Sequence, residues 1–292
     1  MRIIKPTFEE LANADLYKKI EICGRVCYKS EDKITETSAL GFVKRICGYN
    51  HGSVLEHFAL TFKISEELYL SIKSANIPFF SVSNVTFPLV SFNLRAFVTC
   101  YNNNLFMDIL KPITKYMAVN YPDLFAFNSD EEVEEIEYIT DYSILTKQER
   151  YMHKRISIKI TTDRGVTHEL VRHRLASFSQ ESTRYCNYGK DKFGSEITVI
   201  EPCDLDENTY PLWKDAMEKA EKAYFDMINN KATPQIARSV LPNSLKTELC
   251  MTATIEEWNL VFDLRCALGA HPDCRAIMIP IRDYFIKEGY LD

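Results

Sequence analysis

Residues 156–184 read ISIKITTDRGVTHELVRHRLASFSQESTR, and this stretch sets the expectations for the rest of the chain. Its first five residues alternate between isoleucine and polar side chains, a period of two that indicates a half-buried strand. Asp163 is then placed to cap a helix. Val166, Leu170 and Val171 lie at helical spacing and predict the inward face of that helix. The stretch therefore predicts a strand that leads directly into a helix.

Cationic side chains gather at the end of the predicted helix, although the protein carries a net charge of −6. A helix C-terminus stabilises cations, which accounts for Arg172, His173 and Arg174 as structure alone. It does not account for Ser177–Arg184, which adds three serines, Gln180, a glutamate and a further arginine. Guanidinium groups bind phosphate and carboxylate bidentately, while hydroxyls and amides bind sugars and base edges. The composition predicts an exposed polar loop for an anionic, nucleotide-like ligand, with a solvated surface face as the alternative.

The overall composition is that of an ordinary globular protein with a sizeable core, since 46% of the 292 residues are hydrophobic and 26% are charged. No apolar run approaches the roughly 20 residues that span a bilayer, and Met1–Pro6 lacks a signal-peptide core, so we expect a cytoplasmic protein without a membrane partner. Nine cysteines without a Cys-x-x-Cys pair fit a reducing compartment. The acidic balance argues against a general nucleic-acid partner.

The spacing of the histidines argues against a zinc-protease site, and the pattern of the glycines argues against a glycine-rich phosphate-binding loop. His168-Glu169 followed by His173 resembles a zinc-protease pattern, but the histidines are five residues apart rather than four. At about 100° per residue the two rings would lie about 140° apart around a helix, so we expect no metal site. The nine glycines form neither Gly-x-Gly-x-x-Gly nor Gly-x-x-x-x-Gly-Lys. A pyrophosphate would therefore have to be held by side chains.

Arg172-His173-Arg174, seven further residues and then Ser182 form a longer motif, and with it the chain resembles the flavin-dependent thymidylate synthases. Three other segments are similar to that family and occur in the expected order. They are His51-Gly52-Ser53-Val54-Leu55-Glu56-His57, Ala237-Arg238-Ser239-Val240-Leu241-Pro242 and Val261-Phe262-Asp263-Leu264-Arg265, with a weaker match at Gly24-Arg25-Val26-Cys27-Tyr28. The resemblance thus covers the beginning, the middle and the end of the chain.

The resemblance implies an α/β fold, in the α+β sense, with a largely antiparallel sheet flanked by helices. It also implies a homotetramer with sites shared between subunits. We expect residues 1–292 to form a single domain with a long, mostly helical insertion at about 66–150, between the first strand and the Arg-His-Arg helix. We further expect the strands Phe58–Ile64 and Arg155–Thr161 to belong to one sheet.

Local patterns predict the helices. Thr7 and Glu10 predict a capping box before a helix that runs to about Tyr28, and Thr254 and Glu257 predict another before a helix ending at Arg265. Further helices are expected at about 37–49, 66–75, 105–120, 210–230 and 234–241, and from His271-Pro272 onward with a bend at Pro280.

The resemblance also implies a reaction, the reductive methylation of deoxyuridine monophosphate (dUMP) to dTMP. Methylenetetrahydrofolate would donate the carbon, and FAD with NADPH would supply the hydride. The implied dUMP contacts are Glu169, Arg172, Gln180, Glu181, Ser182, Thr183, Arg184, Arg238 and Arg265; the implied FAD contacts are Ser53, Arg172, His173, Arg174, Gln180 and Thr254, with His51 on the folate and flavin side. The chain departs from common family residues at Thr254 and Leu260, and His57 is expected to be structural.

Arg265 is the residue that we predict to be catalytic. Carbon 5 of uracil is a poor nucleophile, and none of the nine cysteines lies in a segment resembling the nucleophile segment of the folate-only thymidylate synthases. A guanidinium placed at O2 and N3 of the pyrimidine would favour the ionised ring and raise the electron density at carbon 5. The alternatives are a catalytically idle nucleotide-binding protein on the same fold, or another nucleotide-modifying flavoenzyme.

Overall fold

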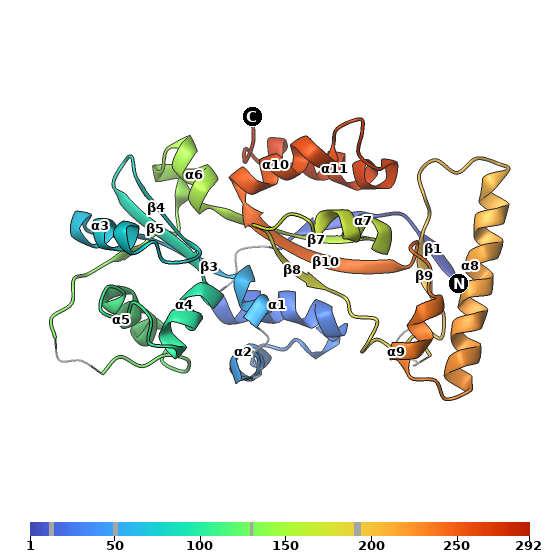
Figure 1. Cartoon of the computed structure of the whole chain (residues 1–292), viewed down its shortest axis with the longest axis horizontal. Coiled ribbons are helices and arrows are strands. Elements are labelled where there is room, and N and C mark those ends of the chain that lie inside the picture. The colour runs from blue at the N-terminus through green and yellow to red at the C-terminus, as the bar shows by residue number, and fades with distance from the viewer. Residues whose placement is uncertain (12–14, 49–51, 129–130, 190–193) are drawn as a thin grey trace.

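Two long strands form the centre of the computed structural model, which describes residues 1–11, 15–48, 52–128, 131–189 and 194–292 (Figure 1). Strands β7 (Arg155–Asp163) and β10 (Lys246–Thr254) pair antiparallel along all nine residues of each. Strand β2 (Thr7–Glu10) adds to β7, and β8 (Ser177–Gln180) adds to β10. The result is an antiparallel sheet of order β2-β7-β10-β8, which confirms the expected sheet and the strand expected at Ile156–Ile160.

One face of this sheet is covered by helices α7 (Arg164–Leu170), α10 (Ile255–Arg265) and α11 (Pro272–Lys287). Asp163 caps α7 as predicted, because its Oδ1 accepts a hydrogen bond from Val166 N at 2.8 Å. Val171, predicted to face inward, is 41% exposed because α7 ends one residue before it. The core on this face is built from Ile156, Ile158, Ile160, Leu249, Met251, Trp258, Phe262, Ile281 and Phe285, among others.

The opposite face is covered by α1 (Leu16–Tyr28), against which α2 (Ser38–Gly48) packs. The capping box predicted at Thr7 and Glu10 was wrong, because these residues form β2 and pair with β7. Asp15 caps α1 instead, and its Oδ1 accepts from Tyr17 N and Lys18 N. Local residue preferences marked a cap, but pairing with a long strand decided the structure of these residues.

A second antiparallel sheet has the order β4-β5-β3-β6. The expectation that the first strand and β7 share a sheet was wrong, since β3 lies in this second sheet and pairs with β5 along its whole length. Alternating hydrophobicity identifies a strand but does not identify its partner. The elements here are β3 (Ala59–Lys63), α3 (Glu66–Ala75), β4 (Phe80–Asn84), β5 (Pro88–Asn93), α4 (Leu94–Asn102), α5 (Lys111–Asn120), β6 (Glu137–Tyr138) and α6 (Lys147–His153). The interval 66–150 therefore contributes three strands besides its helices, and the helix expected at 105–120 is shortened to α5.

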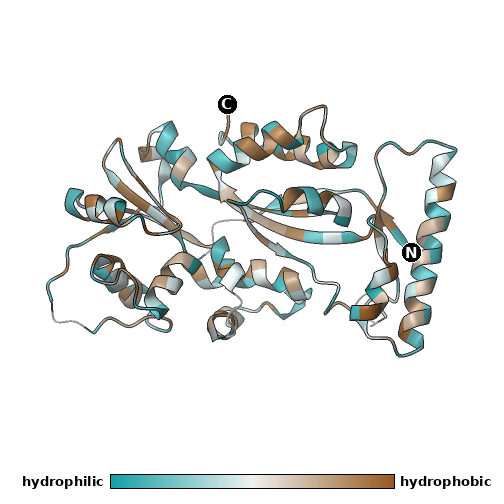
Figure 2. Ribbon diagram, in the orientation of Figure 1, coloured by the Kyte–Doolittle hydropathy of each residue, from teal (hydrophilic) through white to brown (hydrophobic). Residues whose placement is uncertain are grey.

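At the other end of the molecule, β1 (Arg2–Ile4) pairs in parallel with β9 (Thr198–Ile200) beside the long helix α8 (Thr209–Asn229) (Figure 1). Hydrophobic and hydrophilic stretches alternate along α8 in Figure 2, as expected for a helix with one packed side.

The helix expected at 234–241 is divided into α9 (Pro234–Ala237) and a 3₁₀ turn (Arg238–Val240). Short 3₁₀ turns also occur at Glu31–Lys33, Gly52–His57 and Tyr142–Ile144. Within the described ranges, no helix is long and apolar enough to cross a membrane.

Helix α6 is hydrogen-bonded to the turn of the β4–β5 hairpin through Glu149. The fully buried carboxylate of Glu149 accepts hydrogen bonds from Thr86 N at 2.9 Å and Thr86 Oγ1 at 2.8 Å, and from Thr146 N and Oγ1 at 3.0 and 2.7 Å. Burial alone would raise the pKa of Glu149, but these hydrogen bonds lower it to about 2. The ionised carboxylate is therefore the form that stabilises this region.

We predict that Glu149→Gln lowers the free energy of unfolding by about 1–3 kcal/mol at neutral pH, because polar groups that bond the carboxylate lose a charged acceptor. In the folded protein the pKa of Glu149 lies below its ordinary value of 4.5. Its contribution to the free energy of unfolding is therefore complete above pH 4.5 and is lost as the pH falls toward 2. Denaturant unfolding of the wild type and the variant at several pH values measures both effects. The exposed Glu67→Gln is the control; a variant as stable as this control would contradict the prediction.

Candidate functional site

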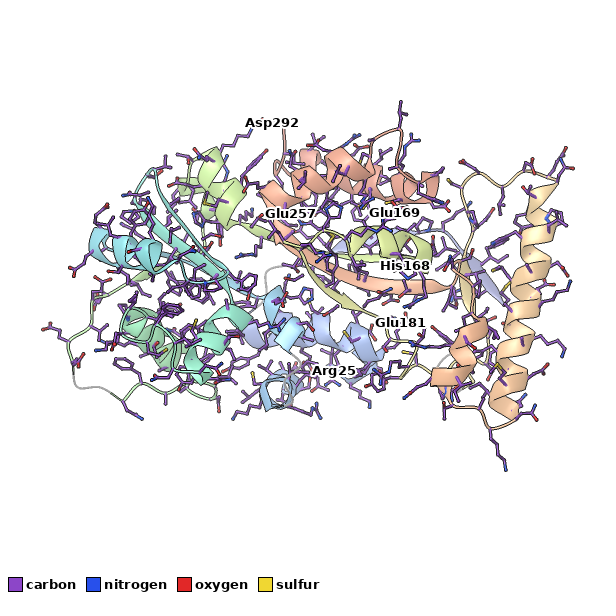
Figure 3. The ribbon with its side chains drawn as sticks, viewed as in Figure 1. Arg25, His168, Glu169, Glu181, Glu257 and Asp292 are labelled. Atoms are coloured by element: carbon purple, nitrogen blue, oxygen red, sulfur yellow. The ribbon has the colours of Figure 1, made fainter. Side chains whose placement is uncertain are left out.

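The C-terminal ends of α7 and α10 meet, and Arg265 joins them. Arg265 Nη1 donates to Glu169 Oε2 at 2.9 Å, Nη2 donates to the Glu169 carbonyl at 2.9 Å, and Nε donates to His173 Nε2 at 3.1 Å. The carbonyl belongs to the last turn of α7, where backbone acceptors lack partners within the helix and the macrodipole favours a cation. Figure 3 shows Glu169 and Glu257 on the side of the central sheet where α10 and α11 lie. The predicted catalytic arginine is thus fixed in orientation by predicted site residues.

His173 is buried between Arg265 and Glu257. It accepts from Arg265 at Nε2, so its proton belongs on Nδ1, which lies 3.6 Å from Glu257 Oε1. Burial and the Arg265 charge lower the pKa of His173, and burial raises the pKa of Glu257. Thr254 Oγ1 accepts from Glu257 N at 3.2 Å and caps α10. His173 is therefore a neutral imidazole next to the fixed guanidinium of Arg265.

The rest of the Arg-His-Arg motif is exposed beside this group. Arg172 and Arg174 are both exposed and flank the buried His173 in the chain. On α10, Leu260 and Leu264 are four residues apart and are 48% and 53% exposed, so they share one helix face. Two exposed guanidinium groups near an apolar helix face suit a ligand that combines phosphate groups with a flat ring.

The exposed polar loop predicted at residues 177–184 is only partly present, since Arg184 is exposed but a strand and several buried residues precede it. Ser177–Gln180 is strand β8, and Ser177, Ser179, Glu181 and Thr183 are buried. The reason is visible in the sequence only in hindsight: Ser177 and Ser179 alternate with period two and pair with β10 on the covered face, whereas Glu181 and Thr183 are buried in the segment that follows the strand.

Glu181 is therefore engaged inside the protein. Its Oε2 accepts from Lys246 Nζ at 2.9 Å and its Oε1 accepts from Tyr188 OH at 3.3 Å. Glu248 accepts from the same Lys246 at 2.7 Å and from Lys29 at 2.5 Å. Burial would raise the pKa of Glu248, but the Lys246 charge and the hydrogen bonds lower it to about 2. Gln180 is also held internally, because its Nε2 donates to Thr167 Oγ1 and Thr247 Oγ1.

A second cationic group lies at the other end of α7. Arg238 Nη1 donates to Thr183 Oγ1 at 3.2 Å, and both residues line a pocket of about 490 Å³ that also contains Arg164 and Ser239. Arg164 Nη1 is buried and has no hydrogen-bond partner. A buried guanidinium nitrogen without a partner is costly, and an anion in this pocket would supply the acceptor. Sequence reasoning missed Arg164, because its position at the start of a helix carries no signal for cations.

Within one chain the expected convergence of arginines is partial. Arg164 is the first residue of α7, and Glu169, which holds Arg265, lies near the end of that helix. Arg265 is thus joined to His173 and Glu169, whereas Arg238 belongs to the pocket at the opposite end of α7. Ser182 and Arg184 follow β8, and Arg184 N donates to Ser182 Oγ at 3.3 Å.

The remaining predicted residues precede β3. Ser53 is exposed in the 3₁₀ turn, while His51 lies outside the described residues. His57 is buried, with Nδ1 2.7 Å from Thr252 Oγ1 and Nε2 2.9 Å from Ser179 Oγ, which agrees with the structural role expected of it. In the part of the chain that the structure describes, no group of three or more histidine, cysteine, aspartate or glutamate side chains is arranged to hold a metal ion.

Comparison with known proteins adds independent findings. The chain is 32% identical over 114 residues to the flavin-dependent thymidylate synthase of Pyrococcus furiosus, covering 39% of this chain and 47% of that protein. It is 33% identical over 116 residues to the enzyme of the same name from Geobacter sulfurreducens, covering 40% and 49%. These matches span about half the length of the relatives. Among solved structures, a UMP/dUMP methylase, PolB, from Streptomyces cacaoi bound with 5-Br dUMP aligns over 98% of this chain and 93% of its own, with a TM-score of 0.44 and 14% identity.

The family described as thymidylate synthase complementing protein matches residues 11–69 and 95–288. Between the two matched ranges lie the end of α3 and the β4–β5 hairpin, inside the interval predicted as an insertion. How far the insertion extends stays a prediction. Since the two matched ranges make up most of the 292 residues, the chain belongs to the thymidylate synthase complementing protein family.

Proposed function

We propose that the protein is a flavin-dependent thymidylate synthase, which methylates dUMP to dTMP with methylenetetrahydrofolate as carbon donor and with FAD and NADPH as the source of hydride. Family membership supports the reaction class. The observation that carries the proposal is the fixed guanidinium of Arg265, held by Glu169 and by a neutral His173 beside the exposed Arg172 and Arg174.

Arg265 would act on the pyrimidine. A guanidinium stabilises a developing negative charge most effectively when its orientation is set before the ligand arrives, because no reorganisation is then needed. The three hydrogen bonds of Arg265 set that orientation. The lowered pKa of His173 keeps its imidazole neutral, so among the hydrogen-bonded side chains of this group the positive charge is that of Arg265. Stabilising the ionised ring raises the electron density at carbon 5, where the new bond forms.

The donor set at the Arg-His-Arg motif fits a flavin dinucleotide. Arg172 and Arg174 offer exposed guanidinium groups for its pyrophosphate, and the face of Leu260 and Leu264 offers apolar contact for its ring. Thr254 would add a hydroxyl contact, and Ser53, whose turn contacts α1 and β8, would add one from another copy of the chain; His51, outside the described residues, stays a predicted contact on the folate and flavin side. When bound, FAD would supply the hydride that reduces the transferred carbon to a methyl group, and NADPH would restore it.

The pocket of Arg238, Arg164 and Thr183 would hold the phosphate of dUMP, together with Ser182 and Arg184. Its two guanidinium groups and the hydroxyl of Thr183 are the donors that a phosphate prefers. Gln180 and Glu181 would act indirectly, by fixing β8 through their internal bonds. The separation of this pocket from Arg265 supports a homo-oligomer, expected to be a homotetramer, in which two chains complete each site.

The first experiment tests the reaction and the role of Arg265. The purified protein should show a flavin spectrum, bind dUMP and release tritium from position 5 of labelled dUMP when supplied with methylenetetrahydrofolate and NADPH. Arg265→Ala should lower the turnover number by about 10²–10³, the loss typical of a deleted electrostatic contact, while flavin stays bound.

The matched control is Arg282→Ala, which removes a partly exposed guanidinium that pairs with Asp283. This control should turn over at the wild-type rate. Loss of flavin from Arg265→Ala would show that its role had been misassigned. Flavin and dUMP binding without tritium release would favour the idle nucleotide-binding protein, and a protein that binds no flavin would remove the proposal.

The second prediction concerns the phosphate pocket. Arg164→Gln and Arg238→Gln should each raise the KM for dUMP about tenfold or more, because each removes one charged partner of the phosphate. The turnover number should change little, since this contact is equal in the ground state and the transition state. Steady-state kinetics at varied dUMP measures the effect, with Arg282→Gln as the control. An unchanged KM in both variants would place the phosphate elsewhere.

A further inference from the structure

Glu257 is a buried carboxyl group that its own helix does not use. Thr254 caps α10, and Thr254 Oγ1 accepts a hydrogen bond from Glu257 N at 3.2 Å. In a complete capping box the glutamate returns a hydrogen bond to the backbone of the cap, as Glu149 does in α6, where it accepts from Thr146 N at 3.0 Å. Among the described contacts of α10 this return bond is absent. The Glu257 carboxyl group is therefore free to act on a different neighbour.

That neighbour is His173, which lies between Glu257 and Arg265. The two α10 residues are eight positions apart, or about 12 Å along the helix axis and about 80° around it. The imidazole spans part of this gap, with Nδ1 3.6 Å from Glu257 Oε1 and Nε2 3.1 Å from Arg265 Nε. The side chains of His173 and Glu257 are only 5% and 7% exposed, so water screens their interaction little. Glu257 thus reaches Arg265 through the imidazole.

The charge of Glu257 selects one tautomer of His173. At 3.6 Å the carboxylate is too far for a hydrogen bond and acts electrostatically. It favours the tautomer with the proton on Nδ1, which leaves the Nε2 lone pair for Arg265. In the other tautomer, Nε2–H would face Nε–H of Arg265, and two donors form no bond. Arg265 would then keep its two bonds to Glu169 but lose the bond that sets the rotation of the guanidinium plane.

Three helices supply the ionisable groups around His173. Glu257 and Arg265 belong to α10, and Glu169 of α7 accepts from Arg265 at 2.9 Å. From α11 the thiol of Cys274 lies near Glu169 and Arg265, and burial raises its pKa to about 12, so it stays neutral. With His173 neutral, this group contains two carboxylates and one guanidinium. It can therefore take up one proton as the pH falls.

That proton goes to Glu257 rather than to His173. Burial and the neighbouring Glu256 raise the pKa of Glu257, whereas burial and the Arg265 charge lower the pKa of His173. The carboxylate form of Glu257 is complete at pH values above its raised pKa and is lost as the pH falls through it. Since burial disfavours the charge, a neutral side chain at this position would suit the stability of the free protein better. A buried acid kept under these conditions points to a functional role.

We propose that Glu257 is a positioning residue that acts through His173 to hold the guanidinium of Arg265 in one orientation. The inference rests on the proposed function where it assigns Arg265 to the pyrimidine, whereas the contacts among the three residues do not depend on it. The sequence predicts Glu257 as the second half of a capping box. The structure directs its carboxyl group to His173 instead.

Glu257→Gln tests the proposal, because it removes the charge and keeps the shape of the side chain. We expect it to lower the turnover number about tenfold at neutral pH, with flavin still bound. The midpoint of denaturant unfolding should not fall, whereas an acid with a purely structural role would lower it. The matched control is Glu256→Gln, which makes the same change at the exposed neighbouring position and should turn over at the wild-type rate.

The pH dependence separates positioning by charge from packing. The wild-type turnover number should exceed that of Glu257→Gln about tenfold at neutral pH, and this ratio should approach one as the pH falls through the pKa of Glu257, which lies above 4.5. The reason is that the wild-type side chain is then neutral as well. A ratio that stays the same at every pH would assign the effect to packing.

A second measurement needs no turnover. In the free protein with isotope-labelled histidine, the ring nitrogen signals of His173, identified by their loss in His173→Asn, should show the Nδ1–H tautomer. They should shift as Glu257 titrates above pH 4.5, and this shift should be absent in Glu257→Gln. If the wild type releases no tritium, the proposed function fails, and the His173 titration alone decides whether Glu257 acts on the ring.

Four results would overturn the positioning role. They are wild-type turnover by Glu257→Gln, a rate ratio independent of pH, a lower unfolding midpoint of this variant, and His173 signals that do not respond to Glu257 in the wild type.

Discussion

The pairing of β7 with β10 is the constraint on which the rest of the structure depends. The strands are antiparallel and each is followed directly by a helix, so α7 and α10 leave the pair at opposite ends. The strands extend about 31 Å, and helices of seven and eleven residues extend about 10 and 16 Å. The two helices fold back over the same face of the sheet and run toward each other. Together they cover nearly the whole length of the strand pair. Their C-terminal ends meet, and Arg265 reaches Glu169 and His173 for this reason.

The meeting of two helix C-termini also explains the chemistry of the site. Both macrodipoles point their negative ends at the same place, which favours the cations that follow α7 and end α10. The carbonyl of Glu169 is one of the acceptors that α7 itself leaves without partners, and Arg265 uses it. The same arrangement buries His173 next to a positive charge and keeps it neutral. The meeting of the C-terminal ends of α7 and α10 thus holds Arg265 in place and also sets up its proposed catalytic role.

The other face of the pair is polar, and its charges are bound to each other. Lys246 joins Glu181 to Glu248, and Lys29 adds to Glu248 from α1. Removing one partner from such a network leaves a buried charge uncompensated, so the network ties β8 to one position beside β10. Further along this face, Arg155 lies where the second sheet approaches, and its nitrogen without a partner marks the place where the network is incomplete.

The sequence by itself determined the strand and the cap of residues 156–170, most helices and the residues that carry the family resemblance, because these depend on local periodicity and short motifs. It misassigned Thr7–Glu10 and Ser177–Gln180, since whether a polar, alternating segment forms a loop, a cap or a strand depends on an available partner strand. Only the tertiary structure decided that β3 and β7 lie in different sheets, that Glu181 is an internal ion-pair partner, and that Arg164 belongs with Arg238. Contacts between residues far apart in the chain follow from register and from the way helices fold back on a sheet, and neither is encoded in a local pattern.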